Sequence, residues 1–355
     1  MSPDLSPLRG HRILDFSRHA PGPFATLVAA LLGADVLKVE LPEGGDPLRA
    51  MDRAAFERLN AGKRSITLDL KSPEGTGVAR RLAKTADVLV EGFRPGAMER
   101  LGLDYESLRR DAPALVYVSI SGYGQSGPYR ERAGHDVNYM AASGALYGAR
   151  APLPLLAADF AAGGLFAVTG ILAALLARRS SGVGAYLDLS MHHGLLSLLP
   201  LAGGPAGERL SGRYPNYTLY RTKDGGFLSV GALELPFWRA FCETIGRPDL
   251  ASRIDDPEAR SEAARVVETR ELDAWEEAFS GVDACVEPVR SPEAARRHAQ
   301  ARHRDAGDFG PTLPFGPGTR PLAPAPDLGQ HTDEVLLELG YTREELSELR
   351  QKRVC

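Results

Sequence analysis

The sequence is poor in cysteine, and its three cysteines follow neither a metal-binding nor a disulfide spacing. This scarcity excludes a disulfide-stapled scaffold and favours a reduced, cytoplasmic protein. The chain also lacks an excess of basic residues, since 42 Lys and Arg stand against 46 Asp and Glu. Nucleic-acid binding usually needs a basic face, so we expect no nucleic-acid partner. The first residues lack the charged segment and apolar run of a secretory signal.

Long apolar runs are equally scarce, and only residues 160–177 approach the length of a membrane-spanning helix. Three glycines interrupt this run, and Asp159 stands directly before it. Aspartate is a favoured N-cap, so we expect Asp159 to cap a buried core helix. The sequence therefore predicts no membrane partner.

The first two hundred residues alternate short runs rich in β-branched residues with helical patterns. Such alternation predicts βαβ units. We therefore predict an α/β fold whose large, Rossmann-like domain, residues 1–200, has an open and mostly parallel sheet. The expected strands are 12–17, 35–40, 65–70, 87–93, 115–120 and 185–190, and helical patterns cover 23–33 and 73–86.

The rest of the chain has a different texture. A Gly- and Pro-rich stretch predicts a linker, and a hairpin signal around an Asp-Gly-Gly turn opens a smaller α+β domain. A second Pro- and Gly-rich stretch predicts an extended linker, and a final helix with Thr332 as N-cap is expected to rejoin the large domain. The expected boundaries are 201–216, 217–298, 299–331 and 332–355.

One glycine motif needs a decision. Gly122, Gly124 and Gly127 form a G-x-G-x-x-G directly after a predicted strand. A dinucleotide-binding loop should open a helix at its third glycine and have an acidic residue about 20 positions later. Here Pro128 follows Gly127, and no carboxylate stands at that distance. We interpret the motif as a turn that leaves a strand end.

Titratable residues near the predicted strand ends are the candidates for chemistry. His135 follows the glycine turn, Asp159 begins the apolar run, and Glu234 follows the predicted hairpin. Each also has a structural explanation: a hydrogen-bonded histidine, an N-cap, and an acid at a helix start. The histidine pair 192–193 is adjacent in sequence and so points in different directions, which gives no metal site.

Eight segments together give the chain a family resemblance that covers nearly its whole length. It resembles the class III CoA-transferase (CaiB/BaiF-type) superfamily, and its branch of α-methylacyl-CoA racemases in particular. The "AGHDVNY" and "VGALE" stretches carry the resemblance to that branch. The other segments are "APGPFATLVAALLGADVLKVE", "NAGKRSITLDLKSPEG", "ADVLVEGFRPGAMERLGLDYE", "SGYGQSGPYRER", "AADFAAGG", "YRTKDGGFLSVGALELPFW", "DACVEPV" and "LGQHTDEVLLELGY".

The resemblance implies an enzyme with two possible chemistries. In racemases of this type the residues matching His135 and Asp159 act as acid and base on the two faces of Cα, and the one matching Glu234 orients the histidine. In transferases the residue matching Asp159 attacks the acyl-CoA thioester, giving an anhydride and then an aspartyl-CoA thioester. A CoA-thioester-binding protein with little turnover is a third interpretation. We also expect the helix start at Asp159 to supply N–H donors for an enolate.

The resemblance further implies that an acyl-CoA thioester is the substrate, with no cofactor and no metal. It implies an interlocked homodimer in which His135 and Glu234 belong to different subunits. His19 falls where the family usually has a nonpolar residue at the acyl end, which leaves the acyl specificity open. The residues implied in CoA binding are Lys38, Leu68, Asp69, Leu70, Lys71, Gly92, Phe93, Arg94, Arg100, Gly134, Asp136, Val137, Asn138 and Tyr139.

Overall fold

The computed structural model describes residues 6–147, 154–304, 312–314 and 322–355. The chain separates into two compact units: residues 1–198 with 300–355, and residues 199–299. A six-stranded parallel sheet forms the large unit, and its strand order is β3-β2-β1-β4-β5-β6. The strands are β1 (Arg12–Asp15), β2 (Asp35–Glu40), β3 (Arg64–Thr67), β4 (Val88–Glu91), β5 (Val116–Ser121) and β6 (Tyr186–Ser190).

The predicted α/β fold with a parallel sheet is confirmed, and every strand expected in the large domain forms. Helices cover both faces of the sheet, because the alternate side chains of its buried strands are apolar on both sides. One face packs against α1 (Pro21–Leu31), α7 (Asp136–Ser143), α8 (Phe166–Ser181), α9 (Met191–Ser197) and the π-helix η1 (Ala157–Leu165). The other packs against α4 (Pro73–Thr85), α5 (Ala97–Leu101), α6 (Tyr105–Leu108), α16 (Thr332–Glu338) and α17 (Arg343–Gln351).

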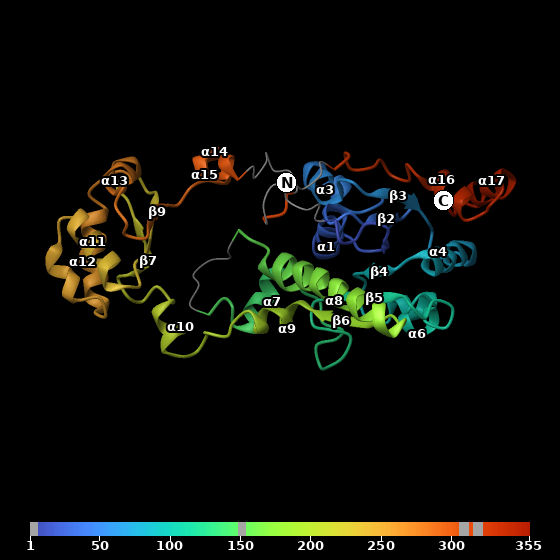
Figure 1. Ribbon diagram of the computed structural model, residues 1–355, viewed down its shortest axis with the longest axis horizontal. Coiled ribbons are helices and arrows are strands. Elements are labelled where there is room, and N and C mark those ends of the chain that lie inside the picture. Colours follow the sequence, from blue (N-terminus) through green and yellow to red (C-terminus); the bar gives the residue numbers. More distant parts are fainter. Residues whose placement is uncertain (1–5, 148–153, 305–311, 315–321) are drawn as a thin grey trace. The chain divides into compact units, whose positions relative to one another are not determined.

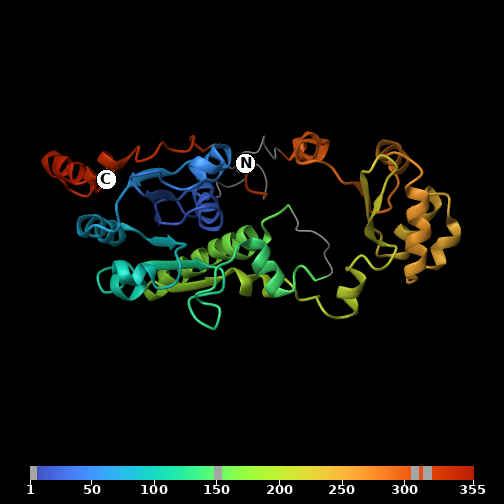
Figure 2. The same cartoon turned by 180° about the vertical axis from the view of Figure 1, so that it is seen from behind.

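The C-terminal helices complete the second layer of the large unit. In both views the red α16 and α17 lie beside α4 and the β3 edge of the sheet (Figure 1, Figure 2). Lys352 pairs with Glu74 of α4 at 2.9 Å, and the His331 N–H donates to the Ser65 carbonyl at 2.8 Å. The remaining helices of this unit are α2 (Leu48–Met51) and α3 (Arg53–Asn60).

The small unit is a three-stranded antiparallel sheet with helices, as expected of an α+β domain. Its strands are β7 (Tyr217–Arg221), β8 (Phe227–Gly231) and β9 (Val286–Pro288), in that order. The hairpin turns at Gly225, whose φ of 84° favours glycine. Its helices are α10 (Pro205–Arg209), α11 (Leu235–Thr244), η2 (Pro248–Ser252), α12 (Pro257–Val267), α13 (Leu272–Phe279) and α14 (Pro292–Arg297), followed by α15 (Ala299–His303).

Two expected helix caps are wrong. Asp159 lies inside the first turn of η1, which begins at Ala157, and its side chain caps nothing. Thr332 is the first residue of α16 rather than its N-cap, because its hydroxyl oxygen accepts the Thr67 N–H at 3.2 Å. The predicted final helix is also two helices, separated at Gly340, whose φ is 83°.

The apolar stretch forms a single helical run, Ala157–Ser181, that is long and apolar enough by length and composition to cross a membrane. Ala162, Ala167 and Ile171 on one side of this run are buried in the core of the large unit. Leu165 and Leu176 on another side are exposed. The burial of the first side agrees with the prediction of a core helix.

Candidate active site

The strand order places a crevice between β1 and β4. The chain runs from β1 to β3 on one side of the sheet and returns through β4 to β6 on the other, so these neighbouring strands lead in opposite directions. Ligands of open α/β sheets bind at such a point, at the carboxyl ends of the strands. Gly92 after β4 lies close to Ser17 after β1, since a Cβ on Gly92 would lie 3.7 Å from the Ser17 Cβ.

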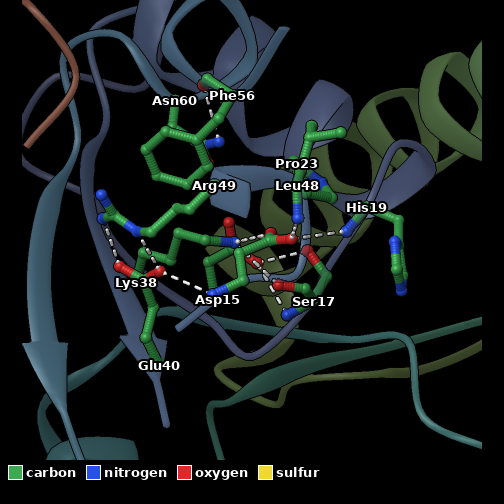
Figure 3. A network of polar contacts seen from close by, with 12 residues as sticks. Asp15, Ser17, His19, Pro23, Lys38, Glu40, Leu48, Arg49, Phe56 and Asn60 are labelled. Carbon is green, nitrogen blue, oxygen red and sulfur yellow. Dashed lines mark hydrogen bonds and ion pairs between the residues drawn. The ribbon is translucent and has the colours of Figure 1, made fainter. Parts of the chain in front are cut away.

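A buried ionic network fixes the turn between β1 and α1 (Figure 3). Asp15, at the end of β1, pairs with the Lys63 ammonium at 3.2 Å and accepts the Thr26 hydroxyl at 2.7 Å. Lys38 pairs with Asp46 at 3.0 Å, and Asp46 in turn accepts the His19 N–H at 3.2 Å. The network therefore holds His19 at a φ of 66°, which is unusual for a residue with a side chain.

The N-terminal turn of α1 packs directly against η1. A Cβ on Gly163 would lie 3.2 Å from the Pro21 Cβ, and one on Gly164 would lie 2.5 Å from a Phe24 ring carbon. The rings of Phe24 and Phe160 are 4.8 Å apart. These glycines let η1 approach the turn after β1, which brings the start of η1 to the crevice. Single turns of π-helix are frequent at functional sites.

Asp159 sits in that first turn of η1, half-buried. Burial, followed by the negative charge of Asp136, raises the pKa of Asp159 to about 7. A carboxyl group of this kind exchanges a proton near neutral pH, which an ordinary surface aspartate does not. Its backbone N–H donates to the Asp136 carboxylate at 2.9 Å. The expectation that this N–H serves an enolate is therefore wrong, because it already has an acceptor.

His135 directly precedes α7 and exposes its side chain. Its backbone N–H donates to the Asn138 side-chain oxygen at 3.0 Å, which fixes the start of the helix. The next residue, Asp136, is buried and holds the Asp159 N–H. One hydrogen bond thus brings the two predicted acid–base residues, His135 and Asp159, to the same part of the molecule.

Tyr139 closes the space behind His135. Its hydroxyl donates to the Gly134 carbonyl at 2.5 Å, and its ring lies against Gly122, where a Cβ would be only 2.4 Å away. Burial, and then the charge of Asp159, raise the pKa of Tyr139 to about 12. Gly122 is therefore required for packing rather than for binding a phosphate.

The rest of the glycine motif agrees with the turn interpretation. The Gly124 N–H donates to the Ser121 hydroxyl at 3.0 Å, and the Gln125 N–H donates to the Asp188 carboxylate at 3.0 Å. These amides are already paired and cannot cradle a pyrophosphate. The next helix begins only at Asp136.

Comparison with known proteins identifies the family. A family model described as CoA-transferase family III matches residues 8–332. The chain belongs to this family. It is 38% identical to α-methylacyl-CoA racemase of Homo sapiens over 98% of this chain and 97% of that protein. It is 34% identical to succinate–glutarate CoA-transferase of Agrobacterium fabrum, over 94% and 96% of the two chains.

Solved structures agree with this membership. A CAIB/BAIF family protein from Brucella suis superposes with a TM-score of 0.80 at 27% identity, over 95% of this chain and 100% of that one. The Rv3272 protein from Mycobacterium tuberculosis superposes with a TM-score of 0.78 at 28% identity, over 94% of this chain and 100% of that one. The family assignment drawn from the sequence is confirmed.

The residues that the family suggests for CoA lie at the carboxyl ends of several strands. Arg94 and Arg100 are exposed after β4, and Phe93 is half-buried. After β3, Leu68 and Leu70 are buried, whereas Lys71 is exposed. Asp69 accepts the Lys71 N–H at 3.0 Å; near His135, Gly134 is partly buried while Val137 and Asn138 are exposed.

Lys38 is a correction to the expected CoA site. Its side chain is fully buried, and its ammonium donates to the Ser17 carbonyl at 2.8 Å beside the Asp46 carboxylate. The ammonium therefore supports the turn after β1 from below and does not face a phosphate. The underlying reason is that Lys38 points from β2 into the network of Figure 3.

Arg18 is a residue that sequence reasoning missed. Its guanidinium lies 5.0 Å from the centre of the Phe93 ring, across the crevice between the ends of β1 and β4. The available signal was its place just after the first strand of a doubly wound sheet. Asp136 was also expected only at the CoA, whereas its carboxylate binds the Asp159 N–H.

Glu234 belongs to the small unit and is described there alone. It is exposed, follows β8 and precedes α11, and its carbonyl accepts the Trp238 N–H at 3.1 Å. Its side chain makes no capping hydrogen bond to α11, so the helix does not occupy the carboxylate. Among the residues that the structure describes, no cluster of His, Cys, Asp and Glu could hold a metal ion.

Proposed function

We propose that the protein is a racemase that inverts the α-carbon of 2-methylacyl-CoA thioesters. The observation that carries this proposal is the pairing of Asp159, with its pKa near 7, and His135 through Asp136. Both groups exchange protons near neutral pH, as a two-base reaction requires. Support also comes from two curated relatives named α-methylacyl-CoA racemase, which are 38% and 39% identical to the chain.

The proposed reaction is a proton transfer through an enolate. One group, His135 or Asp159, takes the α-proton, and the electron pair of the C–H bond moves into the thioester carbonyl. The other group then donates a proton to the opposite face of Cα. The two groups exchange protonation states between the two directions, so each enantiomer is a substrate.

The enolate oxygen needs hydrogen-bond donors, since the α-proton of a thioester is only weakly acidic. The first turn of α7 provides N–H groups without acceptors inside the helix, directly after His135. We assign the enolate oxygen to these N–H groups of Asp136 and Val137. The neighbouring Asp159 N–H is not available because Asp136 accepts it.

We extend the proposal to an interlocked homodimer, in which Glu234 of one protomer orients His135 of its partner. The support is that Glu234 lies in the small unit, exposed and free of a capping bond. A carboxylate beside the imidazole would fix its tautomer and stabilise the imidazolium. The cytoplasmic location, the use of no cofactor and the lack of a membrane partner remain predictions of the sequence.

A second candidate function is CoA transfer with Asp159 as the nucleophile. Several relatives are CoA-transferases, including succinyl-CoA:glutarate CoA-transferase of Mus musculus at 32% identity. A nucleophilic carboxylate acts in its ionised form, and a pKa near 7 leaves much of Asp159 protonated at neutral pH. That pKa therefore favours the racemase.

One experiment separates the two functions. The protein is incubated in D2O with (R)-2-methylacyl-CoA, with and without a free carboxylic acid, and the products are analysed by mass spectrometry and chiral chromatography. Deuterium at Cα together with the loss of configuration supports the racemase. Transfer of CoA to the added acid without exchange at Cα identifies a transferase and overturns the proposal.

A further inference from the structure

Three arginine side chains gather around Gly96, which precedes α5. A Cβ on Gly96 would lie 3.3 Å from an Arg100 guanidinium nitrogen and 3.4 Å from one of Arg130. Arg94 and Gly96 line the same cavity of about 130 Å³. Gly96 has a φ of 80° and no side chain, so it leaves this space open. Arg130 reaches it from the glycine turn, far along the chain.

The arginine donors in this group are not all satisfied. The Arg130 Nε is buried and has no hydrogen-bond partner among the described residues. It lies 3.6 Å from a Glu131 carboxylate oxygen, which is too long for a hydrogen bond. Buried donors in native proteins nearly always have an acceptor. The missing acceptor therefore points to a ligand.

The charge of the group has the same implication. Two guanidinium groups this close to one another repel. A Glu99 carboxylate oxygen lies 3.8 Å from the same Cβ position and offsets one of the two charges. The second positive charge remains, together with that of Arg94 at the cavity. An anion with several acceptor oxygens would relieve the repulsion and satisfy the open donors.

A phosphate group fits these requirements best. Its oxygens accept the paired N–H groups of a guanidinium, and arginine recognises this geometry better than lysine does. We propose that Arg130, together with Arg100, binds a phosphate group of the CoA part of the substrate. This rests on the proposed function only in that the substrate is a CoA thioester.

The proposal gives the glycine motif a purpose beyond aiming His135. Ser121 and Asp188 hold the amides of Gly124 and Gln125, which ties the turn to the ends of β5 and β6. The Arg130 N–H then donates to the Gly127 carbonyl at 3.2 Å. The turn therefore presents a guanidinium group to the anion, instead of the backbone amides that a dinucleotide-binding loop would use.

Calorimetric binding of CoA to the full chain tests the proposal without any turnover. Arg130→Gln is expected to weaken CoA binding by about ten- to a hundredfold, the loss typical of a charge-assisted contact. Arg130→Lys keeps the charge without the fork and should recover part of the affinity. Arg132→Gln is the matched control, since its guanidinium lies 4.5 Å from the Tyr129 ring in the same turn. It should bind CoA as the wild type does.

Truncated ligands identify the phosphate. Dephospho-CoA lacks the 3′-phosphate and pantetheine lacks every phosphate. If Arg130 holds the 3′-phosphate, Arg130→Gln weakens binding of CoA but not of dephospho-CoA. If it holds the pyrophosphate, the variant weakens both to the same extent, which also supports the proposal. Unchanged CoA affinity in Arg130→Gln overturns it, and so does an equal loss for pantetheine, which would show general damage.

The racemase proposal is tested separately on the same variants. Proton exchange in D2O is measured on an N-acetylcysteamine thioester of a 2-methyl acid, which carries no phosphate. Arg130→Gln should exchange this substrate at the wild-type rate. If the wild type binds CoA but exchanges neither thioester, the racemase proposal fails while the phosphate contact stands.

Discussion

The carboxylate of Asp136 accepts the backbone N–H of Asp159 at 2.9 Å. This contact joins the start of α7 to the first turn of η1, and it sets a buried negative charge beside a second carboxyl group. Because like charges disfavour each other's ionised form, Asp136 helps to raise the pKa of Asp159 to about 7, after burial itself. The same residue therefore positions Asp159 and tunes it.

Asp136→Asn should shift the pH profile of exchange to lower pH. An asparagine oxygen can still accept the Asp159 N–H, but the negative charge is lost, so the pKa of Asp159 falls toward its ordinary value. The measurement is kcat/KM for deuterium exchange between pH 5 and 9. Asp111→Asn, whose partner Lys84 is a surface residue, serves as the control. An unchanged acidic limb in Asp136→Asn would contradict this account.

Asp159→Asn should abolish turnover and yet stabilise the fold at alkaline pH. A carboxyl group whose pKa is raised from 3.8 to about 7 contributes fully below pH 3.8, and this contribution is lost as the pH rises through 7. The wild type should therefore lose roughly 1–4 kcal/mol against the variant between pH 4 and 8, at about 1.4 kcal/mol per pKa unit. Urea unfolding at both pH values measures the difference. An equal difference at pH 4 and pH 8 would disprove it.

His135→Ala should lower the rate of α-proton exchange by about 10²–10⁴-fold, the usual effect of removing a positioned acid–base group. Glu234→Gln should cost less and alter the pH profile, because the imidazolium loses a partner charge. Deuterium exchange with each pure enantiomer provides the measurement. If His135→Ala turns over at the wild-type rate while Asp159→Asn is inactive, the transferase replaces the racemase.

Gly122→Ala should destabilise the protein by about 1–3 kcal/mol, the typical cost of overpacking. Its Cβ would lie 2.4 Å from the Tyr139 ring, so the ring behind His135 must move and exchange should slow. Gly77→Ala in α4 is the control, since nothing lies within 4 Å of its Cβ, and it should stabilise the helix slightly. Thermal unfolding would refute the packing argument if both variants behaved alike.

Asp15→Ala should destabilise the protein by about 3–5 kcal/mol, because it leaves the buried Lys63 ammonium without its counter-charge. Burial opposes ionisation of Asp15, but Lys38 and Lys63 outweigh it and lower the pKa of Asp15 to about 2. Asp111→Ala removes a surface partner of Lys84 and should cost under about 1 kcal/mol. Equal losses in chemical unfolding would show that the network of Figure 3 is not a structural support.

The sequence by itself determined the strands, the parallel sheet and the family. Strands such as β2 (Asp35–Glu40) are local: β-branched apolar runs between helical patterns specify them without reference to the rest of the chain. The family depends on many short matches along the whole length, so no single side chain decides it. His135 and Asp159 could therefore be named as candidates from the sequence.

Tertiary structure alone decided what surrounds those candidates. Burial and neighbouring charge depend on contacts between distant segments, so neither the pKa of Asp159 nor the loss of Lys38 to a buried ion pair could be read from the chain. The expected caps at Asp159 and Thr332 failed for the same reason. A residue that favours a cap also accepts other contacts, and packing against η1 or β3 offered better ones. The guanidinium of Arg130 meets that of Arg100 only because the glycine turn folds back onto the end of β4.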